Sequence, residues 1–184
     1  MKISTKKLAV TAMLAALTAA GSALRITIPI EIGGTTSFHL GNIMCALSGI
    51  LLGPGLGGLA AGLGSAIYDC FNPLYISECW ITFIMKFFYG VAAGLTIGRK
   101  SEWGYLRAVL ASAAGAVTYA VLYLGKSFFY SSILVSGLEV GPALAVVVTK
   151  LPATVFNAVV AIVAAPLLAI AVRNALRKNR LSID

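Results

Sequence analysis

The sequence predicts an all-α membrane protein, a single domain of residues 1–184 folded as a bundle of six transmembrane helices. Of the 184 residues, 59% are hydrophobic and only 11% are charged, and the mean hydropathy is +0.94. Soluble domains are about 45–50% apolar and about 25% charged. Several apolar stretches reach about 20 residues, the length needed to cross a hydrocarbon layer about 30 Å thick. The basic residues cluster at alternate ends of these stretches, as they do in multi-pass proteins.

Turn-forming residues set the helix boundaries. A Gly-Pro-Gly run at 53–55 separates the second helix from the third, and Asn72-Pro73 ends the third. Pro29 with Gly33-Gly34 closes the first helix, and a charged run at 99–102 divides the fourth from the fifth. The last helix is too long for a straight crossing, and its two prolines are expected to bend it. The expected helices are 7–28, 40–53, 56–72, 79–98, 105–130 and 140–172.

The distribution of charge predicts the orientation. Ten of the fourteen Lys and Arg residues lie at the start of the chain, in and after loop 99–104, or at its end. Because basic loops stay in the cytoplasm, both termini are expected to be cytoplasmic, with loops 29–39, 73–78 and 131–139 outside. This clustering at membrane ends also argues against a nucleic-acid binder, despite the net charge of +8.

The first helix could be mistaken for a secretory signal peptide, since a basic start precedes an apolar stretch that ends in small residues. However, the stretch from Leu8 to Leu24 is longer than the usual apolar region of 7–15 residues. It is therefore interpreted as the first membrane span.

No motif supports an enzyme or a bound cofactor. The run Gly55 to Ala60 resembles a dinucleotide-binding GxGxxA motif, but no strand precedes it. The Gly-Lys-Ser run at 125–127 resembles the end of a phosphate-binding loop, but Ala120 stands where its first glycine belongs. The chain has one histidine, and its three cysteines lack metal-binding spacing. We expect no metal, no cofactor and no ATP-hydrolysing site.

Cys70 and Cys79 could approach each other across an outer loop, but free cysteines are favoured.

Polar and aromatic residues gather at one predicted membrane level, near the outer ends of every helix after the first. Ionisable groups within a bilayer cost several kcal/mol and are functional by default. Their convergence predicts a pocket open to the outside, with donors, acceptors and aromatic faces for a flat ring. The candidate substrate-binding residues are His39, Asn42, Tyr68, Asp69, Asn72, Glu78, Trp80, Lys86, Tyr119, Tyr123, Lys126, Lys150 and Asn157.

These residues also have a structural explanation. They could pair with one another to hold helix ends together, for example Asp69 with Lys86 or Lys126, and Glu139 with Lys150. Trp80 could instead be an interfacial belt residue.

Small residues recur every four positions on the first helix, at Ala12, Ala16 and Ala20. They share one face of that helix. Such faces let helix backbones approach closely in lipid. The stripe either packs internally or docks against another protein.

Three sequence runs suggest a family. The runs are Phe38-His39-Leu40-Gly41-Asn42-Ile43-Met44, Gly49-Ile50-Leu51-Leu52-Gly53-Pro54 with Gly57 to Ser65, and Tyr68-Asp69 with Glu78-Cys79-Trp80-Ile81-Thr82-Phe83. With these runs the chain resembles the substrate-binding S components of energy-coupling factor (ECF) vitamin transporters, over nearly its whole length.

The resemblance implies a function and partners. It implies a multi-pass protein of a prokaryotic plasma membrane that binds a vitamin with high affinity near the outer face. A transmembrane scaffold (T) subunit and two cytoplasmic ATPases would energise uptake. The AxxxA motif that docks the scaffold in this family would be Ala12 and Ala16, extended by Ala20.

The charges of the candidate site guide the choice of ligand. A strongly anionic ligand would want an excess of basic groups, and a cation would want an excess of acids. The mixed set favours a small, polar, roughly neutral heterocycle. The resemblance to the family implies a ligand of the pyridoxine or hydroxymethylpyrimidine type, with riboflavin or a queuosine precursor also open.

Two other functions compete with the S component. One is a self-sufficient secondary transporter of a small metabolite, although the two halves lack the self-similarity common in carriers. The other is a structural membrane scaffold, which would have no saturable small-molecule site.

Overall fold

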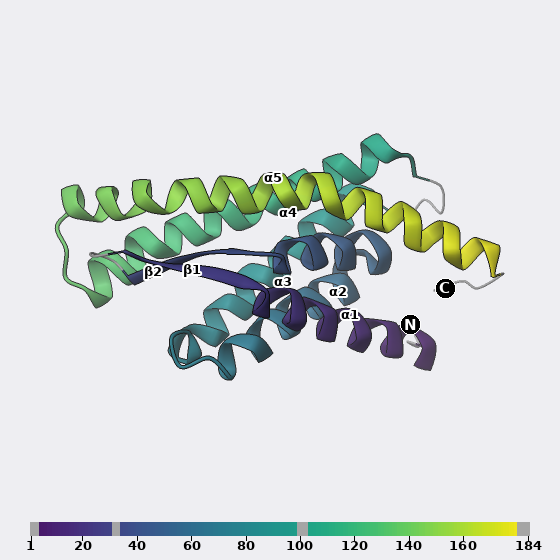
Figure 1. Ribbon diagram of the computed structural model, residues 1–184, viewed down its shortest axis with the longest axis horizontal. Coiled ribbons are helices and arrows are strands. Elements are labelled where there is room, and N and C mark those ends of the chain that lie inside the picture. The colour runs from purple at the N-terminus through teal and green to yellow at the C-terminus, as the bar shows by residue number, and fades with distance from the viewer. Residues whose placement is uncertain (1–3, 31–33, 99–102, 180–184) are drawn as a thin grey trace.

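A computed structural model describes residues 4–30, 34–98 and 103–179. These residues form long helices and one two-stranded sheet (Figure 1). In chain order the elements are α1 (Thr5–Ala23), β1 (Arg25–Ile30), β2 (Gly34–His39), α2 (Gly41–Cys70), the 3-10 helix η1 (Ile76–Glu78), α3 (Cys79–Ile97), α4 (Tyr105–Lys126), the π-helix η2 (Ser127–Val135) and α5 (Val140–Lys178).

The helices have the length and composition of membrane spans. In the described part of the chain, four stretches are long and apolar enough to cross a bilayer: Gly41–Cys70, Ile76–Ile97, Tyr105–Val135 and Val140–Lys178. This confirms the expected helical membrane protein. The expected divider at 99–102 lies outside the described residues.

The predicted break between the second and third helices lies within α2. Gly53 has φ 75° and ψ −174°, a non-helical backbone that divides α2 into two helices. Glycine adopts positive φ without the Cβ clash of other residues, and Pro54 then restarts the helix at a position that needs no amide donor. The Gly-Pro-Gly run therefore marks this break correctly.

The first predicted helix was wrong at its C-terminal end, because α1 stops at Ala23 and a β-hairpin follows. In this hairpin β1 and β2 are antiparallel, with Arg25 opposite His39 and Thr27 opposite Ser37. The β-branched residues of β1 alternate as Ile-Thr-Ile, which favours a strand over a helix. The expected outer loop 29–39 is therefore largely β2, and the fold is helical with one short sheet rather than purely α. The position of Gly33 lies outside the described residues.

Close helix contacts depend on glycine. A Cβ placed on Gly90 of α3 would lie 2.6 Å from the carbonyl oxygen of Gly57 in α2. A Cβ placed on Gly64 would overlap the carbonyl oxygen of Ala15 in α1. Backbones meet this closely only where side chains are absent, as expected for helices packed in lipid.

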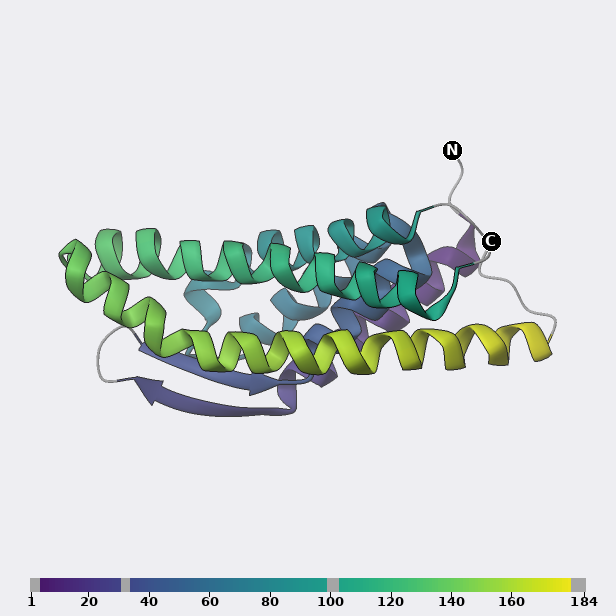
Figure 2. The same cartoon turned by 90° about the horizontal axis from the view of Figure 1, so that it is seen from above.

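The two ends of the molecule differ in architecture. The start of α1 and the end of α5 lie at one end, and the hairpin extends towards the opposite end (Figures 1 and 2). There the hairpin lies against the N-terminal half of α5. Asn157 holds it, accepting a hydrogen bond from the His39 amide (3.0 Å) and donating one to the Ser37 carbonyl (2.8 Å).

Candidate functional site

A cavity of about 390 Å³ opens at the hairpin end of the molecule. Its size falls within the usual range of small-molecule pockets, about 300–1,000 Å³. All the helices and both strands of the described chain contribute to its wall. The lining residues include Ser22, Arg25, Thr35, Thr36, Ser37, His39, Ser65, Asp69, Tyr75, Glu78, Thr82, Met85, Lys86, Tyr119, Tyr123, Lys126, Ser131, Ser136, Lys150, Thr154 and Asn157.

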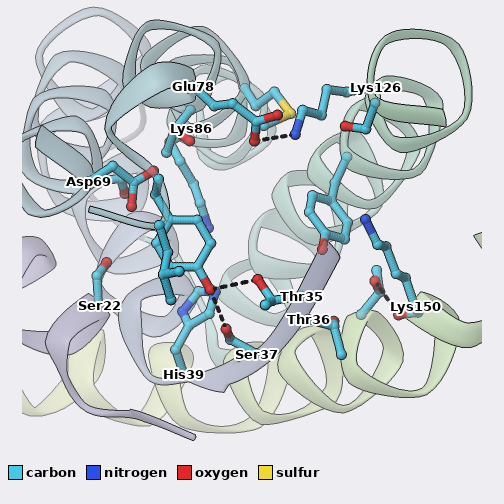
Figure 3. A pocket seen from close by; sticks show the side chains of 18 of the residues that line it. Ser22, Thr35, Thr36, Ser37, His39, Asp69, Glu78, Lys86, Lys126 and Lys150 are labelled. Carbon is cyan, nitrogen blue, oxygen red and sulfur yellow. Dashed lines mark hydrogen bonds and ion pairs between the residues drawn. The ribbon is translucent and has the colours of Figure 1, made fainter. Parts of the chain in front are cut away.

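One ion pair closes part of the cavity wall. Lys126 Nζ, in the last turn of α4, lies 2.5 Å from Glu78 Oε2 (Figure 3). Asp69 forms no ion pair with a lysine in the part of the chain that the structure describes. The sequence-based pairing of Asp69 with Lys86 or Lys126 was therefore wrong. Glu139 is exposed at the start of α5, three turns from Lys150, so that predicted pair does not form either.

Lys86 is held by a neutral partner and an aromatic face. Its side chain is only 3% exposed, and its ammonium donates to the Asn42 side-chain oxygen. The same nitrogen lies 3.7 Å from the centre of the Tyr119 ring, a cation–π distance. Asn42 and Tyr119 thus fix the direction of Lys86, and neither of these two side chains carries a negative charge.

Three tyrosines form an aromatic column beside this lysine. The rings of Tyr89 and Tyr119 are stacked at 6.0 Å, and those of Tyr119 and Tyr123 at 5.7 Å. Tyr119 and Tyr123 also line the cavity, whereas Tyr89 is fully buried behind them. The column presents flat apolar surface to a ligand ring.

The hairpin is tied to the facing loop by Tyr75. The Tyr75 hydroxyl lies 3.1 Å from both the Thr35 and the Ser37 hydroxyls (Figure 3). The guanidinium of Arg25 lies over the Tyr68 ring at 4.3 Å and over the Tyr75 ring at 4.8 Å. These contacts hold the hairpin over one side of the cavity.

Two groups outside the spans have shifted acidity. Burial lowers the pKa of His39 well below its ordinary value, and the charges of Lys86 and Arg25 lower it further. Burial alone would raise the pKa of Tyr75, but its hydrogen bonds with Ser37 and Thr35 and the charge of Arg25 produce a net decrease. His39 is therefore neutral at pH 7.

Most of the candidate residues from the sequence lie together in this cavity. Nine of them line it: His39, Asp69, Glu78, Lys86, Tyr119, Tyr123, Lys126, Lys150 and Asn157.

The structure does not bring the other four candidates to the cavity wall. Asn42 lies behind Lys86 and accepts its hydrogen bond. The Tyr68 ring lies under the Arg25 guanidinium, and the Tyr68 hydroxyl accepts a hydrogen bond from Asn72. Trp80 is 57% exposed on the outside of α3, the position of an interfacial belt residue.

Apart from His39, sequence reasoning missed the residues that the hairpin contributes. Arg25, Thr35 and Ser37 line the cavity, but the hairpin was interpreted as a helix end followed by a loop. An available signal was Arg25 itself, because an arginine inside an apolar stretch is functional by default.

The comparisons with known proteins agree with this architecture. Residues 2–174 match a family model described as the ECF-type riboflavin transporter, S component. The chain belongs to this family. As an S component, it is a membrane-embedded binding subunit for vitamin uptake, and its family is one of transport components rather than enzymes.

The S component also has a curated relative. A protein of Pyrococcus woesei, described only as an uncharacterized protein in a gap 3′ region, is 30% identical over 148 residues. The match covers 73% of this chain and 95% of the relative.

Proposed function

We propose that the chain captures a flavin, with riboflavin as the reference ligand, in the cavity at the hairpin end and passes it to an ECF module for uptake. The observation that supports this proposal is a cavity that combines an aromatic column with polar groups from both strands and every helix. A flat ring packs against the aromatic side chains of Tyr119 and Tyr123 in the cavity wall, while the ribityl hydroxyls and ring heteroatoms need the surrounding donors and acceptors.

The size of the cavity favours a flavin over the smaller rings expected from the sequence. A volume of about 390 Å³ exceeds the requirement of a single six-membered ring such as pyridoxine or hydroxymethylpyrimidine. The description of the matched family also names riboflavin. These three compounds and a queuosine precursor are the ligands to compare.

The proposed topology has six crossings and both termini in the cytoplasm. It counts α1, the two helices of α2, α3, the α4–η2 stretch and α5 as one crossing each. The start of α1 and the end of α5 lie at the same end of the molecule, as an even number of crossings requires (Figure 1). Basic residues such as Arg107 and Arg173 lie towards that end, which supports a cytoplasmic location for it. The cavity then faces outside.

In the proposed transporter a T subunit and two cytoplasmic ATPases supply the energy. Ala12, Ala16 and Ala20 are exposed on α1, whereas Leu14 and Ala15 of the same helix are buried. An exposed stripe of small residues on an apolar helix is a suitable surface for a second membrane helix. We therefore assign scaffold docking to this stripe.

Binding by the purified chain tests the proposed ligand. The S component alone in detergent is titrated with each of the four compounds by calorimetry, and saturable binding of riboflavin tighter than the other three is expected. Lys86→Met and Asp69→Asn should each weaken binding by about 1.5–3 kcal/mol, if each group makes a charged hydrogen bond to the ligand. Lys178→Met, which removes an exposed cation at the far end of α5, is the matched control.

Transport assays test whether uptake requires the T subunit and the ATPases. Proteoliposomes with the T subunit and ATPases should accumulate riboflavin when supplied with ATP, and those with the chain alone should not. Ion-driven accumulation by the chain alone would instead identify a self-sufficient secondary transporter. Absence of binding to any of the four compounds would overturn the proposed ligand class.

A further inference from the structure

The cavity wall carries more positive than negative charge. Its cationic side chains are Arg25, Lys86, Lys126 and Lys150, and its carboxylates are Asp69 and Glu78. His39 is neutral, as argued above. The wall as described therefore has an excess of two positive charges, whereas the sequence suggested a mixed set suited to a neutral ligand.

Three of the four cations have partners. Lys126 is paired with Glu78, Lys86 donates to Asn42 and lies over Tyr119, and Arg25 donates to the Ser22 carbonyl at 2.8 Å while lying over two tyrosine rings.

Lys150 differs from these three. Its side chain is only 4% exposed, and its ammonium has no hydrogen-bond or ion-pair partner among the described residues. The nearest aromatic ring in contact with it, that of Tyr123, has its centre 6.0 Å away. An ammonium at the wall of a cavity, with no hydrogen-bond or ion-pair partner of its own, attracts an anionic group to this position.

The direction of Lys150 places that anion inside the cavity. Figure 3 shows Lys150 extending from α5 into the cavity, on the side opposite Asp69 and Lys86. An anionic group is repelled by Asp69 and attracted by Lys150. A ligand with one such group would therefore bind with a fixed orientation, its charged end towards α5.

A hydroxyl in the π-helix provides a second, independent indication. Ser131 of η2 lines the cavity, and its Oγ atom is buried with no hydrogen-bond partner among the described residues. A buried hydroxyl without a partner is uncommon in a native protein. π-Helical turns occur frequently at functional sites. The Ser131 hydroxyl is a suitable donor to an anionic oxygen.

We propose that the physiological ligand carries an anionic group, a phosphate or a carboxylate, bound by Lys150 at the α5 side of the cavity, with Ser131 of η2 as a further donor. The inference rests on the proposed function, since it assumes that the cavity binds a vitamin-like ring. It refines the ligand class from a neutral flavin to a flavin with an acidic side chain. Ammonium–phosphate and ammonium–carboxylate hydrogen bonds are among the strong ones in proteins.

Matched ligands that differ only in the anion test this inference. The probes are riboflavin, riboflavin 5′-phosphate, and the riboflavin analogue whose terminal carbon is a carboxylate. The unmodified chain should bind at least one of the two anionic flavins about 10-fold or more tighter than riboflavin, as expected for a charge-assisted hydrogen bond. Which one gains more distinguishes a phosphate from a carboxylate ligand.

Variants at the two positions separate this effect from misfolding. Lys150→Met should weaken binding of the preferred anionic flavin about 10- to 100-fold and weaken riboflavin binding by a clearly smaller factor, so that the ratio of the two affinities falls. Ser131→Ala should reduce the same preference by a smaller factor, and Lys150→Arg should retain part of it. An unfolding midpoint in detergent close to that of the unmodified chain, together with retained riboflavin binding, shows that each variant is folded.

The outcomes distinguish the two proposals. If riboflavin binds tightly and both anionic flavins bind no better, the inference is wrong and the proposed flavin site stands. The same holds if an anionic preference survives in Lys150→Met. If none of the three flavins binds, both the inference and the proposed ligand class are overturned.

Discussion

Lys126 in the last turn of α4 and Glu78 at the end of η1 form an ion pair of 2.5 Å across 48 positions of the chain. The pair joins the loop that follows α2 to the helix that carries Tyr119 and Tyr123. Both side chains are partly exposed, 14% for Lys126 and 30% for Glu78, so water screens the interaction in part. Its role is to fix the position of this loop at the edge of the cavity.

Breaking this pair should destabilise the protein modestly. Lys126→Met and Glu78→Gln are each expected to lower the free energy of unfolding by about 1 kcal/mol, since the pair is partly solvated. The double variant should cost less than the sum of the two, because the second substitution removes no further pairing. Thermal unfolding in detergent measures all three. Strictly additive losses would show that the two charges do not interact in solution.

Glycine at position 90 should be essential for the packing of α2 against α3. In Gly90→Ala the new methyl group would lie 2.6 Å from the Gly57 carbonyl oxygen, which forces the helices apart. We expect a loss of roughly 1–3 kcal/mol or more, the usual cost of overpacking.

A Gly→Ala substitution in α2, at a position with no close neighbour, controls for helix propensity. A methyl group added at Gly55 would have no other atom within 4 Å, so Gly55→Ala should be neutral or stabilising by up to about 1 kcal/mol. Thermal unfolding of both variants in the same detergent gives the comparison. Equal stability of the two variants would mean that α2 and α3 are farther apart than described.

Acid should destabilise the protein through His39. This residue is partly buried, its Nδ1 is buried without a hydrogen-bond partner among the described residues, and its folded pKa lies well below 6.5. Between that folded pKa and about 6.5, the unfolded chain binds a proton that the folded chain does not. Stability from this group is therefore fully present above about pH 6.5 and is lost as the pH falls, by at most about 1.4 kcal/mol per pH unit.

Unfolding measured between pH 7.5 and 5 tests this dependence. His39→Gln cannot titrate and should flatten the pH profile over this interval. The control is the unmodified chain in the same buffers. An identical slope in both proteins would assign the acid sensitivity to other groups.

The sequence predicted the helices well because their signals are local. Apolar length marks the spans, and the Gly-Pro-Gly run marks the break at Gly53. The hairpin was not predicted, because the six residues of β1 continue the apolar stretch of the first predicted helix. Its Ile-Thr-Ile alternation is the feature that distinguishes a strand, but periodicity over so few residues is weak.

The sequence predicted where the candidate site lies, but it did not predict which of its charged side chains interact with one another. Convergence of polar groups at helix ends follows from topology, so Asp69, Lys86 and Lys150 were placed together correctly. Which groups pair depends on helix rotation and on Asn42, an uncharged partner that no charge count reveals. The excess of two positive charges likewise became visible only in the structure, where Arg25 lines the cavity with the hairpin and Glu139 does not line it.

The alanine stripe of α1 should be needed for transport but not for binding. Ala16 is exposed in the S component, and Ala15 beside it is buried against the bundle. Ala16→Trp adds bulk only to the exposed face, so it should prevent close approach of a scaffold helix and leave the cavity unchanged. We expect riboflavin affinity within about 2-fold of the unmodified chain and a loss of most ATP-dependent uptake, since a difference below about 0.5 kcal/mol is typical of surface substitutions.

Two controls identify the cause of a transport defect in this variant. Leu17→Trp adds similar bulk at a neighbouring exposed position that lies off the stripe, and Ala16→Ser keeps the residue small; both should transport normally. Co-purification of the T subunit and ATPases should fail for Ala16→Trp alone. If instead Ala16→Trp loses ligand binding, or if it assembles and transports as the controls do, the stripe does not dock the scaffold.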